Sequence, residues 1–260
     1  MPVPRVLTIA GSDSGGGAGI QADLKAFAAA GAHGMSAIVA LTAQNTVGVT
    51  AVHEVPAPFV TAQLEAVWDD MGVDAVKTGM LFSRAVIDAV ADFLEAHPAP
   101  LVVDPVMVAS SGAQLLEDDA VEALVSRIFP LATVVTPNLA EAHVLASDSL
   151  LLTKMQLATA IPARAVIVTG GHGDPVDHLL DGDHHVEIAV ERLDVPATHG
   201  AGCTHSATLA ALLARGLSLE EAARGAARAA TEAVRNGLTE IGAGDGPVDV
   251  LDVKGRNATG

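Results

Sequence analysis

A glycine-rich segment late in the chain carries the residues best suited to chemistry. Residues 198–204 read THGAGCT and lead into a stretch of small residues typical of a buried helix. Successive glycines let backbone N–H groups converge, and the positive end of the helix points at the same place, which suits a phosphate in transfer. At a helix start we expect a lowered pKa for Cys203, which would make it a proton acceptor near neutral pH. A small buried residue at a tight turn is the alternative interpretation, and the position directly after Gly-Ala-Gly favours function.

A second glycine-rich segment, residues 11–19, reads GSDSGGGAG and follows an apolar run. Its spacing does not fit the G-x-G-x-x-G of dinucleotide-binding loops, and no Lys-Ser or Lys-Thr pair follows its glycines as in P-loops. The run Asp13-Ser14-Gly15-Gly16 resembles the nucleophile segment of trypsin-like proteases, but those enzymes place His and Asp before the serine, on an all-β fold. A flexible surface turn remains the alternative to a functional loop.

Short apolar runs alternate with amphipathic stretches, which indicates the elements that must position these loops. The alternation predicts a parallel sheet covered by helices on both faces. Two strand-like runs within 177–193 predict a hairpin that turns at Asp181-Gly182. Other strands are expected at 6–10, 36–41, 49–55, 74–80, 101–106, 133–137 and 165–170, and helices at 20–30, 58–71, 83–96, 117–128, 203–215 and 219–236.

Polar and glycine residues gather directly after the predicted strands. Ligands of such sheets bind beyond the carboxyl ends of the strands, so we expect one binding crevice there. No linker or shift in composition divides the chain, and we predict a single domain over residues 1–260 with a frayed tail at 252–260. The polar strand ends lie at 11–19, 42–46, 77–80, 104–106, 136–138 and 169–172.

The composition excludes several classes of function. With 31 acidic and 14 basic residues the net charge is −17, so we expect no nucleic acid and no anionic membrane as partner. Half of the residues are hydrophobic, which supports a large core. The single cysteine gives neither an internal disulfide nor a zinc cage. Without a signal-like leader or a long apolar run, the expected location is the cytoplasm.

Seven segments, in order, carry a family resemblance. They are TIAGSDSGGGAGIQADLK (8–25), TAQNT (42–46), KTGM (77–80), VVDPVM (102–107), TPNLAEA (136–142), GGH (170–172) and THGAGCT (198–204). Together they resemble the hydroxymethylpyrimidine/phosphomethylpyrimidine kinases of thiamine biosynthesis, which belong to the ribokinase-like superfamily. The resemblance implies an α/β fold, a ribokinase-like three-layer sandwich with a central, mainly parallel sheet flanked by helices. It also implies ATP and Mg²⁺ at the carboxyl edge of the sheet, and a homodimer.

The resemblance places the catalytic centre in the late glycine loop. Cys203 would be the base that takes the proton from the hydroxymethyl group or from the monophosphate. The N–H groups of Gly200, Ala201 and Gly202 would stabilise charge on the phosphoryl group in transfer. This division suits phosphoryl transfer, where positioning and electrostatics supply most of the rate.

The binding residues follow from the same resemblance. Asn138 and Glu141, an N-x-x-E pattern, would hold Mg²⁺ through water with help from Asp104, since Mg²⁺ prefers hard oxygen ligands. Gln44 would hydrogen-bond the aminopyrimidine edge, because an amide both donates and accepts. Gly11, Asp23, Met80 and Val106 would complete the pyrimidine pocket, and Asn138, Thr169, Gly171, Gly200 and Gly202 would bind ATP.

Two positions depart from the family pattern. Thr169 stands where many members carry a lysine that neutralises ATP phosphates, and Ala201 stands where a threonine is usual. The stretch between Glu141 and Gly170 is also shorter than expected. With four lysines in the whole chain, backbone N–H groups, a helix terminus and Mg²⁺ would have to carry nucleotide binding.

The leading hypothesis is an ATP- and Mg²⁺-dependent kinase of 4-amino-5-hydroxymethyl-2-methylpyrimidine and of its monophosphate. One alternative is a pyridoxal- or pyridoxine-type vitamin kinase on the same scaffold. Gln44 favours the aminopyrimidine over it, because an aldehyde-bearing pyridine presents different donors and acceptors. Another is a non-catalytic pyrimidine sensor. The departures at Thr169 and Ala201 suggest it, whereas the presence of Cys203, Asn138 and Glu141 is evidence against it.

Two further patterns have simpler interpretations. Residues 242–245, Gly-Ala-Gly-Asp, resemble the anion hole of sugar kinases, but a Gly-Pro pair follows rather than a helix, so we interpret them as a turn. The His- and Asp-rich stretch 172–185 fits exposed hairpin turns better than one helical face, and a transition-metal site there is the less favoured alternative.

Overall fold

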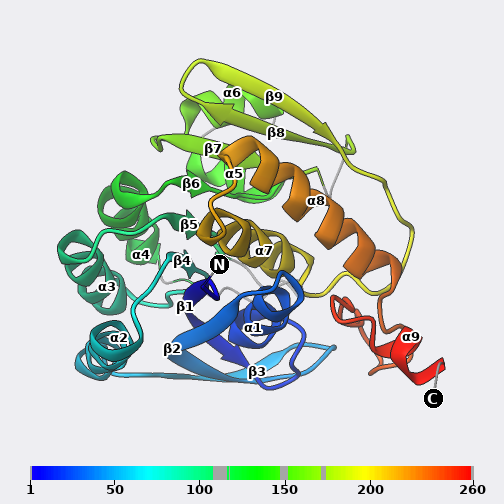
Figure 1. Ribbon diagram of the computed structural model, residues 1–260, viewed down its shortest axis with the longest axis horizontal. Helices are drawn as coiled ribbons and strands as arrows, with labels where there is room; N and C mark the ends of the chain where they lie inside the picture. The colour runs from blue at the N-terminus through cyan, green and yellow to red at the C-terminus, as the bar shows by residue number, and fades with distance from the viewer. Residues whose placement is uncertain (1, 108–115, 117, 147–151, 171–173, 259–260) are drawn as a thin grey trace.

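Nine strands form one sheet whose central part is parallel (Figure 1). The computed structural model describes residues 2–107, 116, 118–146, 152–170 and 174–258. The strand order is β3-β2-β1-β4-β5-β6-β7-β8-β9. Pairings from β2 through β7 are parallel, while β3 and the β8–β9 hairpin join antiparallel at the two edges. The strands are β1 (Arg5–Asp13), β2 (His33–Gln44), β3 (Val49–Glu54), β4 (Ala75–Thr78), β5 (Leu101–Val103), β6 (Val134–Val135), β7 (Ala165–Val168), β8 (Val176–Asp181) and β9 (His184–Ala189).

Helices cover both faces of the sheet and make the three layers that the sequence predicts. One apolar cluster joins a sheet face to α2, α3, α4, α5 and α6, and a second joins the other face to α1, α7 and α8. The helices are α1 (Gly19–Ala29), α2 (Ala57–Met71), α3 (Arg84–Ala96), α4 (Asp118–Ala123) with a π-helical continuation (Leu124–Ile128) and a 3₁₀ turn (Phe129–Leu131), α5 (Leu139–Leu145), α6 (Lys154–Ala160), α7 (Ala201–Ala214), α8 (Leu219–Arg235) and α9 (Val253–Ala258).

Helix α7 is the central element of its layer because it is apolar on nearly all sides. Its residues from Thr204 to Leu212 are all buried, and it packs between α1 and α8. A helix that is apolar all round is stable only where protein surrounds it. Its N-terminus, which carries Cys203, is therefore held at a fixed place above the parallel strands.

Several bounds differ from the prediction for identifiable reasons. Strands β1 and β2 run beyond their apolar stretches into the polar loops, since Ser12 and Asp13 pair in register with Leu41 and Thr42. The segment 252–260, which was expected to fray, contains α9. The predicted hairpin turn is confirmed, with Gly182 in the left-handed region at φ 58°. Within the described residues, no helix combines the length and apolarity needed to span a bilayer.

Candidate active site

The two glycine loops, far apart in sequence, touch each other at the carboxyl edge of the sheet. Gly200, which precedes α7, has φ 87°, and a Cβ atom there would lie 1.8 Å from the carbonyl oxygen of Gly17. Only glycine tolerates both this left-handed conformation and this close approach. The contact brings residues 15–19 against the start of α7.

The side chain of Asp13 organises the first glycine loop. Its carboxylate accepts hydrogen bonds from the N–H groups of Gly15 (2.7 Å), Gly17 (3.0 Å) and Ala18 (2.9 Å). It also lies 3.0 Å from Nε2 of His199. Because a carboxylate of the chain already fills this nest of donors, the loop is not a phosphate cradle. That agrees with the rejection of nucleotide motifs at residues 11–19.

The second glycine loop keeps donors available. The N–H of Ala201 donates to the carbonyl oxygen of Thr198 at 3.0 Å, so one of the three predicted donors is already used. The N–H groups of Gly200 and Gly202 have no partner among the described residues, and neither has that of Cys203. They stand at the positive end of a 14-residue helix, which is a site suited to an anion.

The expected lowering of the Cys203 pKa is wrong. Burial raises the pKa of this thiol to about 12, and the nearby carboxylates of Asp23 and Asp104 add to the rise. The ammonium of Lys77 and a backbone hydrogen bond from Gly19 act in the opposite direction without prevailing. The helix terminus does not outweigh the loss of hydration at a half-buried thiol. Cys203 is therefore protonated at neutral pH.

A buried ion pair lies beneath the site. The ammonium of Lys77 is 2.9 Å and 3.0 Å from the two carboxylate oxygens of Asp23, and both side chains are fully buried. Thr8 donates a further hydrogen bond of 2.6 Å to Asp23. Burial lowers the pKa of Lys77, but the negative charges of Asp23 and its neighbours, together with the hydrogen bond to Asp23, outweigh it, so the net shift is upward. Asp23, predicted as a pocket residue, thus lies under the pocket with its carboxylate engaged.

Asp104 connects this ion pair to helix α7. Its Oδ2 atom lies 3.9 Å from the ammonium of Lys77 and accepts a 2.9 Å hydrogen bond from the hydroxyl of Ser206. Ser206 stands one turn after Gly202 on α7. The polar contact therefore fixes the first turn of α7 against the end of β5.

The N-x-x-E pattern forms a capping box at the start of α5. Asn138 Oδ1 accepts from the N–H of Glu141 at 2.9 Å, while Glu141 Oε2 accepts from the N–H of Asn138 at 2.9 Å. Burial and the charge of Asp104 raise the pKa of Glu141 to about 8. A buried carboxylate whose pKa is raised by a second carboxylate suits a divalent cation bound through oxygen. The residues present therefore fit Mg²⁺, which Asp104 and Glu141 would hold through water.

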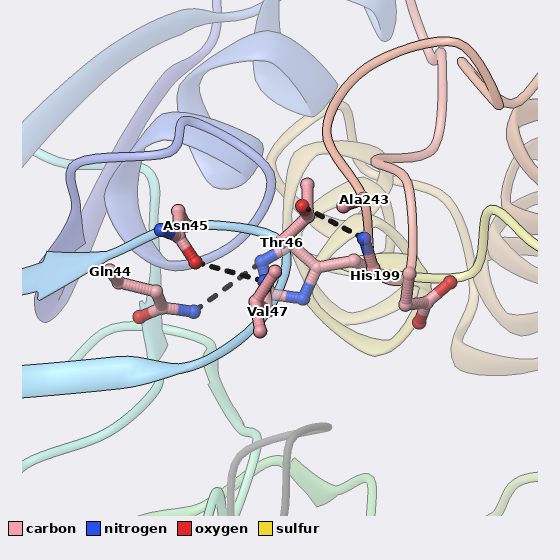
Figure 2. Close-up of a pocket in the computed structure, with 8 residues that line it drawn as sticks. Gln44, Asn45, Thr46, Val47, His199 and Ala243 are labelled. Atoms are coloured by element: carbon pink, nitrogen blue, oxygen red, sulfur yellow. Dashed lines mark hydrogen bonds between the residues drawn. The ribbon is translucent and has the colours of Figure 1, made fainter.

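A pocket of about 280 Å³ opens beside Gln44 and the second glycine loop. Figure 2 shows the Gln44 amide directed at the His199 ring, with its Nε2 atom 3.5 Å from the Nε2 of His199. The turn at 242–245 closes the far side, where Gly244 N–H donates to the Thr46 hydroxyl at 3.2 Å. The lining residues are Gln44, Asn45, Thr46, Val47, His199, Ala243, Gly244 and Asp245.

The other predicted pocket residues lie at the ends of β1, β4 and β5. A Cβ atom on Gly11 would be 2.4 Å from the Met80 methyl carbon, so these two residues are in contact. Val106 is half-buried and follows Asp104 in a tight turn. Thr169 is half-buried at the end of β7. Gly171 and His172 lie outside the described residues.

The sequence profile of the phosphomethylpyrimidine kinase family matches residues 13–249. A hydroxymethylpyrimidine/phosphomethylpyrimidine kinase of Rhizobium meliloti (strain 1021) is 49% identical over 253 residues, which cover 93% of this chain and 95% of that protein. The chain belongs to the phosphomethylpyrimidine kinase family. The family predicted from the seven segments is thereby confirmed, and with it the class of enzyme, a kinase.

Solved structures confirm the fold of this phosphomethylpyrimidine kinase family member. Pyridoxal kinase of Bacillus subtilis in an ADP complex superposes with a TM-score of 0.88 at 36% identity, covering 97% of this chain and 99% of that chain. Phosphomethylpyrimidine kinase of Clostridium difficile 630 gives a TM-score of 0.78 at 38% identity, covering 90% and 100%. Related kinases therefore bind an adenine nucleotide on this fold.

Thr169 stands where many family members carry a lysine, so the other groups that could contact a phosphate become important. Each of the four lysines of this chain is already engaged. Lys25 donates to Gly16 O, Lys77 pairs with Asp23, Lys154 donates to the carbonyl oxygens of Asp174 and Val176, and Lys254 pairs with Glu240. Among the described residues, the N–H groups of Gly200 and Gly202 at the start of α7 remain available to meet a phosphate.

Four residues of the site were missed from the sequence. Asp13, Lys77 and His199 lie in the seven segments that resemble the family, but no role was predicted for them. The sequence predicts only a turn around Asp245. Asp245 accepts from the N–H and the hydroxyl of Thr198, at 2.8 Å and 2.9 Å. The signal for Asp13 was its position at the start of a glycine turn, where Asp side chains accept from nearby N–H groups. The other three depend on contacts between distant segments.

Proposed function

We propose that this chain is an ATP-dependent kinase that phosphorylates 4-amino-5-hydroxymethyl-2-methylpyrimidine and then its monophosphate. The observation that carries the proposal is the contact between Gln44 and His199, whose Nε2 atoms are 3.5 Å apart. Because His199 directly precedes Gly200, this contact sets an amide suited to a pyrimidine edge beside N–H groups suited to a phosphoryl group. Membership of the family supports the same substrate class.

The first reaction is an attack by the hydroxymethyl oxygen on the γ-phosphorus of ATP. The bond to the bridging oxygen breaks, ADP leaves, and the hydroxyl proton must be accepted. The N–H groups of Gly200 and Gly202 stabilise charge on the phosphoryl oxygens. We assign the proton to the Sγ atom of Cys203 in its thiolate form, which the thiol reaches by first giving its own proton to solvent water. Lys77 and the Gly19 N–H are the groups that favour the thiolate.

The cofactors that we propose are ATP and Mg²⁺. When bound, the ion neutralises charge on the phosphates of ATP. Asp104 and Glu141 would hold it through water, and the capping box that fixes Glu141 to Asn138 limits the freedom of this carboxylate. Thr169 and Asn138 would contact the nucleotide, and the resemblance assigns Gly171, outside the described residues, to the same role.

A coupled ADP-release assay with hydroxymethylpyrimidine, its monophosphate and pyridoxal tests the proposal. Turnover of the two pyrimidines with a higher kcat/KM than pyridoxal is the expected result. Absence of ADP release with all three substrates would instead support the non-catalytic sensor. Each reaction is run with and without Mg²⁺, and activity should require the ion.

A Cys203→Ala variant separates the two phosphorylations. A phosphate monoester has a second pKa of about 6, so its acceptor oxygen is already ionised at pH 7.5, whereas the alcohol must lose a proton. We therefore expect a loss of about 10²–10⁴-fold for the alcohol and a much smaller loss for the monophosphate. Equal losses in both reactions would remove the proposed base role, and Cys203→Ser serves as the variant of similar size.

A second candidate activity is phosphorylation of pyridoxal. It is favoured by the TM-score of 0.88 to the pyridoxal kinase of Bacillus subtilis over 97% of this chain. The pyridoxal arm of the assay measures it directly. A kcat/KM for pyridoxal above that for the pyrimidine would make it the main activity.

We also propose a cytoplasmic location and, as the resemblance implies, a homodimer. Leu41, Val47 and Phe59, on and beside the edge hairpin β2–β3, expose 46%, 67% and 63% of their surface. A second copy that covers these side chains is consistent with this exposure. Light scattering coupled to gel filtration measures the mass, and a monomer at micromolar concentration would contradict the proposal.

A further inference from the structure

The β8–β9 hairpin, at the edge of the sheet (Figure 1), brings two histidines and a glutamate together. His178 on β8 lies directly opposite Glu187 on β9, and His185 is the diagonal neighbour of His178. The His178 Nδ1 and His185 Nε2 atoms are 3.0 Å apart. One ligand atom from each of the three side chains lies within 4.8 Å of the other two.

The two imidazoles are held against each other. Their rings stack at a centroid distance of 5.2 Å with an interplanar angle of 13°. Both side chains are half-buried, whereas that of Glu187 is exposed. The two ring nitrogens that face each other therefore lie at fixed positions, as a metal site built from imidazoles requires.

We propose that His178, His185 and Glu187 bind one zinc ion, or a similar late first-row divalent ion. Two imidazole nitrogens and one carboxylate are a common ligand set for zinc, with water in the fourth position. With metal–nitrogen bonds of about 2.0–2.1 Å, tetrahedral geometry separates two nitrogens by about 3.3 Å. The observed 3.0 Å needs only a small opening of the pair. The exposed Glu187 side chain is free to close the third contact.

The nitrogen ligands distinguish this site from the proposed Mg²⁺ site. Mg²⁺ prefers oxygen ligands. It would therefore bind Asp104, which follows β5, and Glu141, on α5, in preference to an imidazole pair. Lys154 on α6 donates to the carbonyl oxygens of Asp174 and Val176 at 2.6 Å and 2.8 Å. Its charge acts against a cation at His178, while the carboxylate of Asp174 acts in favour of one.

His184 provides a matched control in the same hairpin. It neighbours His185 in the sequence, but successive strand residues point to opposite faces, and its Nε2 atom lies 3.5 Å from a carboxylate oxygen of Glu220. His184→Asn removes one histidine from the hairpin, as the test variants do, but it leaves His178, His185 and Glu187 in place.

The test is a calorimetric titration of the untagged chain with Zn²⁺ after dialysis against a chelator, in buffer with excess Mg²⁺. We expect one equivalent to bind. His178→Asn and His185→Asn should each raise the Kd at least about tenfold, and His184→Asn should leave it within about twofold. Cys203→Ser should also leave the Kd unchanged, which excludes the thiol as ligand. Thermal unfolding confirms that each variant is folded.

Electron paramagnetic resonance of the Cu²⁺-loaded chain identifies the ligands by a second route. Hyperfine coupling to two imidazole nitrogens is expected in the wild-type chain, and coupling to one in His185→Asn. Absence of stoichiometric Zn²⁺ binding would overturn the proposal. So would binding that survives both His178→Asn and His185→Asn, or that is lost equally in His184→Asn.

Discussion

The Nε2 atom of His199 lies 3.0 Å from a carboxylate oxygen of Asp13, and this contact joins the two glycine loops of the site. Asp13 holds the first loop in shape, and His199 stands directly before the N-terminus of α7. The pair therefore sets the position of the unpaired N–H groups at the start of α7 relative to Gln44, which His199 also contacts.

Asp13→Asn should lower the free energy of unfolding by about 1.5–3 kcal/mol at pH 7, because hydrogen bonds to a charged acceptor are lost. Burial raises the pKa of Asp13, but hydrogen bonds from His199, Ala18 and Gly15 outweigh it and the net shift is downward from 3.8. The stabilisation is therefore complete above about pH 4 and disappears as the pH falls through the lowered pKa of the folded state. Urea unfolding at pH 7 and at acid pH measures the free energy of unfolding of both chains. The difference between wild type and Asp13→Asn should become smaller at acid pH.

Asp74→Asn is the matched control, because Asp74 pairs with Arg5 at the surface. An exposed pair contributes about 1 kcal/mol or less. If Asp13→Asn costs no more than Asp74→Asn at pH 7, the role assigned to Asp13 is wrong.

Lys77→Met should destabilise the chain by about 3–5 kcal/mol, since it leaves the fully buried carboxylate of Asp23 without a countercharge. The double variant Lys77→Met with Asp23→Asn removes both charges and should recover much of this loss. Denaturant unfolding of the two single variants and the double variant gives the coupling energy. Additive losses would show that the two side chains do not act as a pair.

The single cysteine of the chain allows its ionisation to be measured directly. With a pKa raised to about 12 by burial, the Cys203 thiol should react slowly with iodoacetamide at pH 7. The alkylation rate should rise about tenfold per pH unit through pH 9 without levelling off. The same chain unfolded in urea is the control and should level off near the ordinary thiol pKa of about 8.5. A plateau near neutral pH in the folded chain would restore the lowered pKa that the sequence suggested.

Thr169→Lys should lower the KM for ATP by about tenfold, because it adds a charge-assisted contact to phosphate. The KM for the pyrimidine should not change. Thr159→Lys on the exposed side of α6 is the control, since it alters the net charge equally. An ATP KM that falls as much in Thr159→Lys would attribute the effect to net charge alone.

The sequence predicted the order of the strands and of the longer helices, because each is a local pattern of apolar residues, whereas it gave no bounds for the short helices α5, α6 and α9. The hairpin turn at Gly182 and the helix from Arg84 to Ala96 follow from such patterns. The roles of Asp13 and Asp245 did not follow, since each depends on a partner segment whose position only the fold supplies. The N-x-x-E pattern was read as a metal motif although it is also a capping box, and the structure shows that Asn138 serves the latter role.

The pKa of Cys203 did not follow from the sequence for a different reason. The sequence correctly predicts that Cys203 lies at the start of a helix, but it does not show how much water folding removes from the thiol. Burial prevails over the helix terminus here, because desolvation acts on the whole charge while the terminus supplies a fraction of one.

The bond between Asp13 and His199 also has a consequence for synthesis of the chain on the ribosome. A nascent chain that stops before residue 199 already contains Asp13 and its glycine loop, yet it lacks His199 and helix α7. The contact that joins the two glycine loops therefore forms only after about three quarters of the polypeptide has emerged.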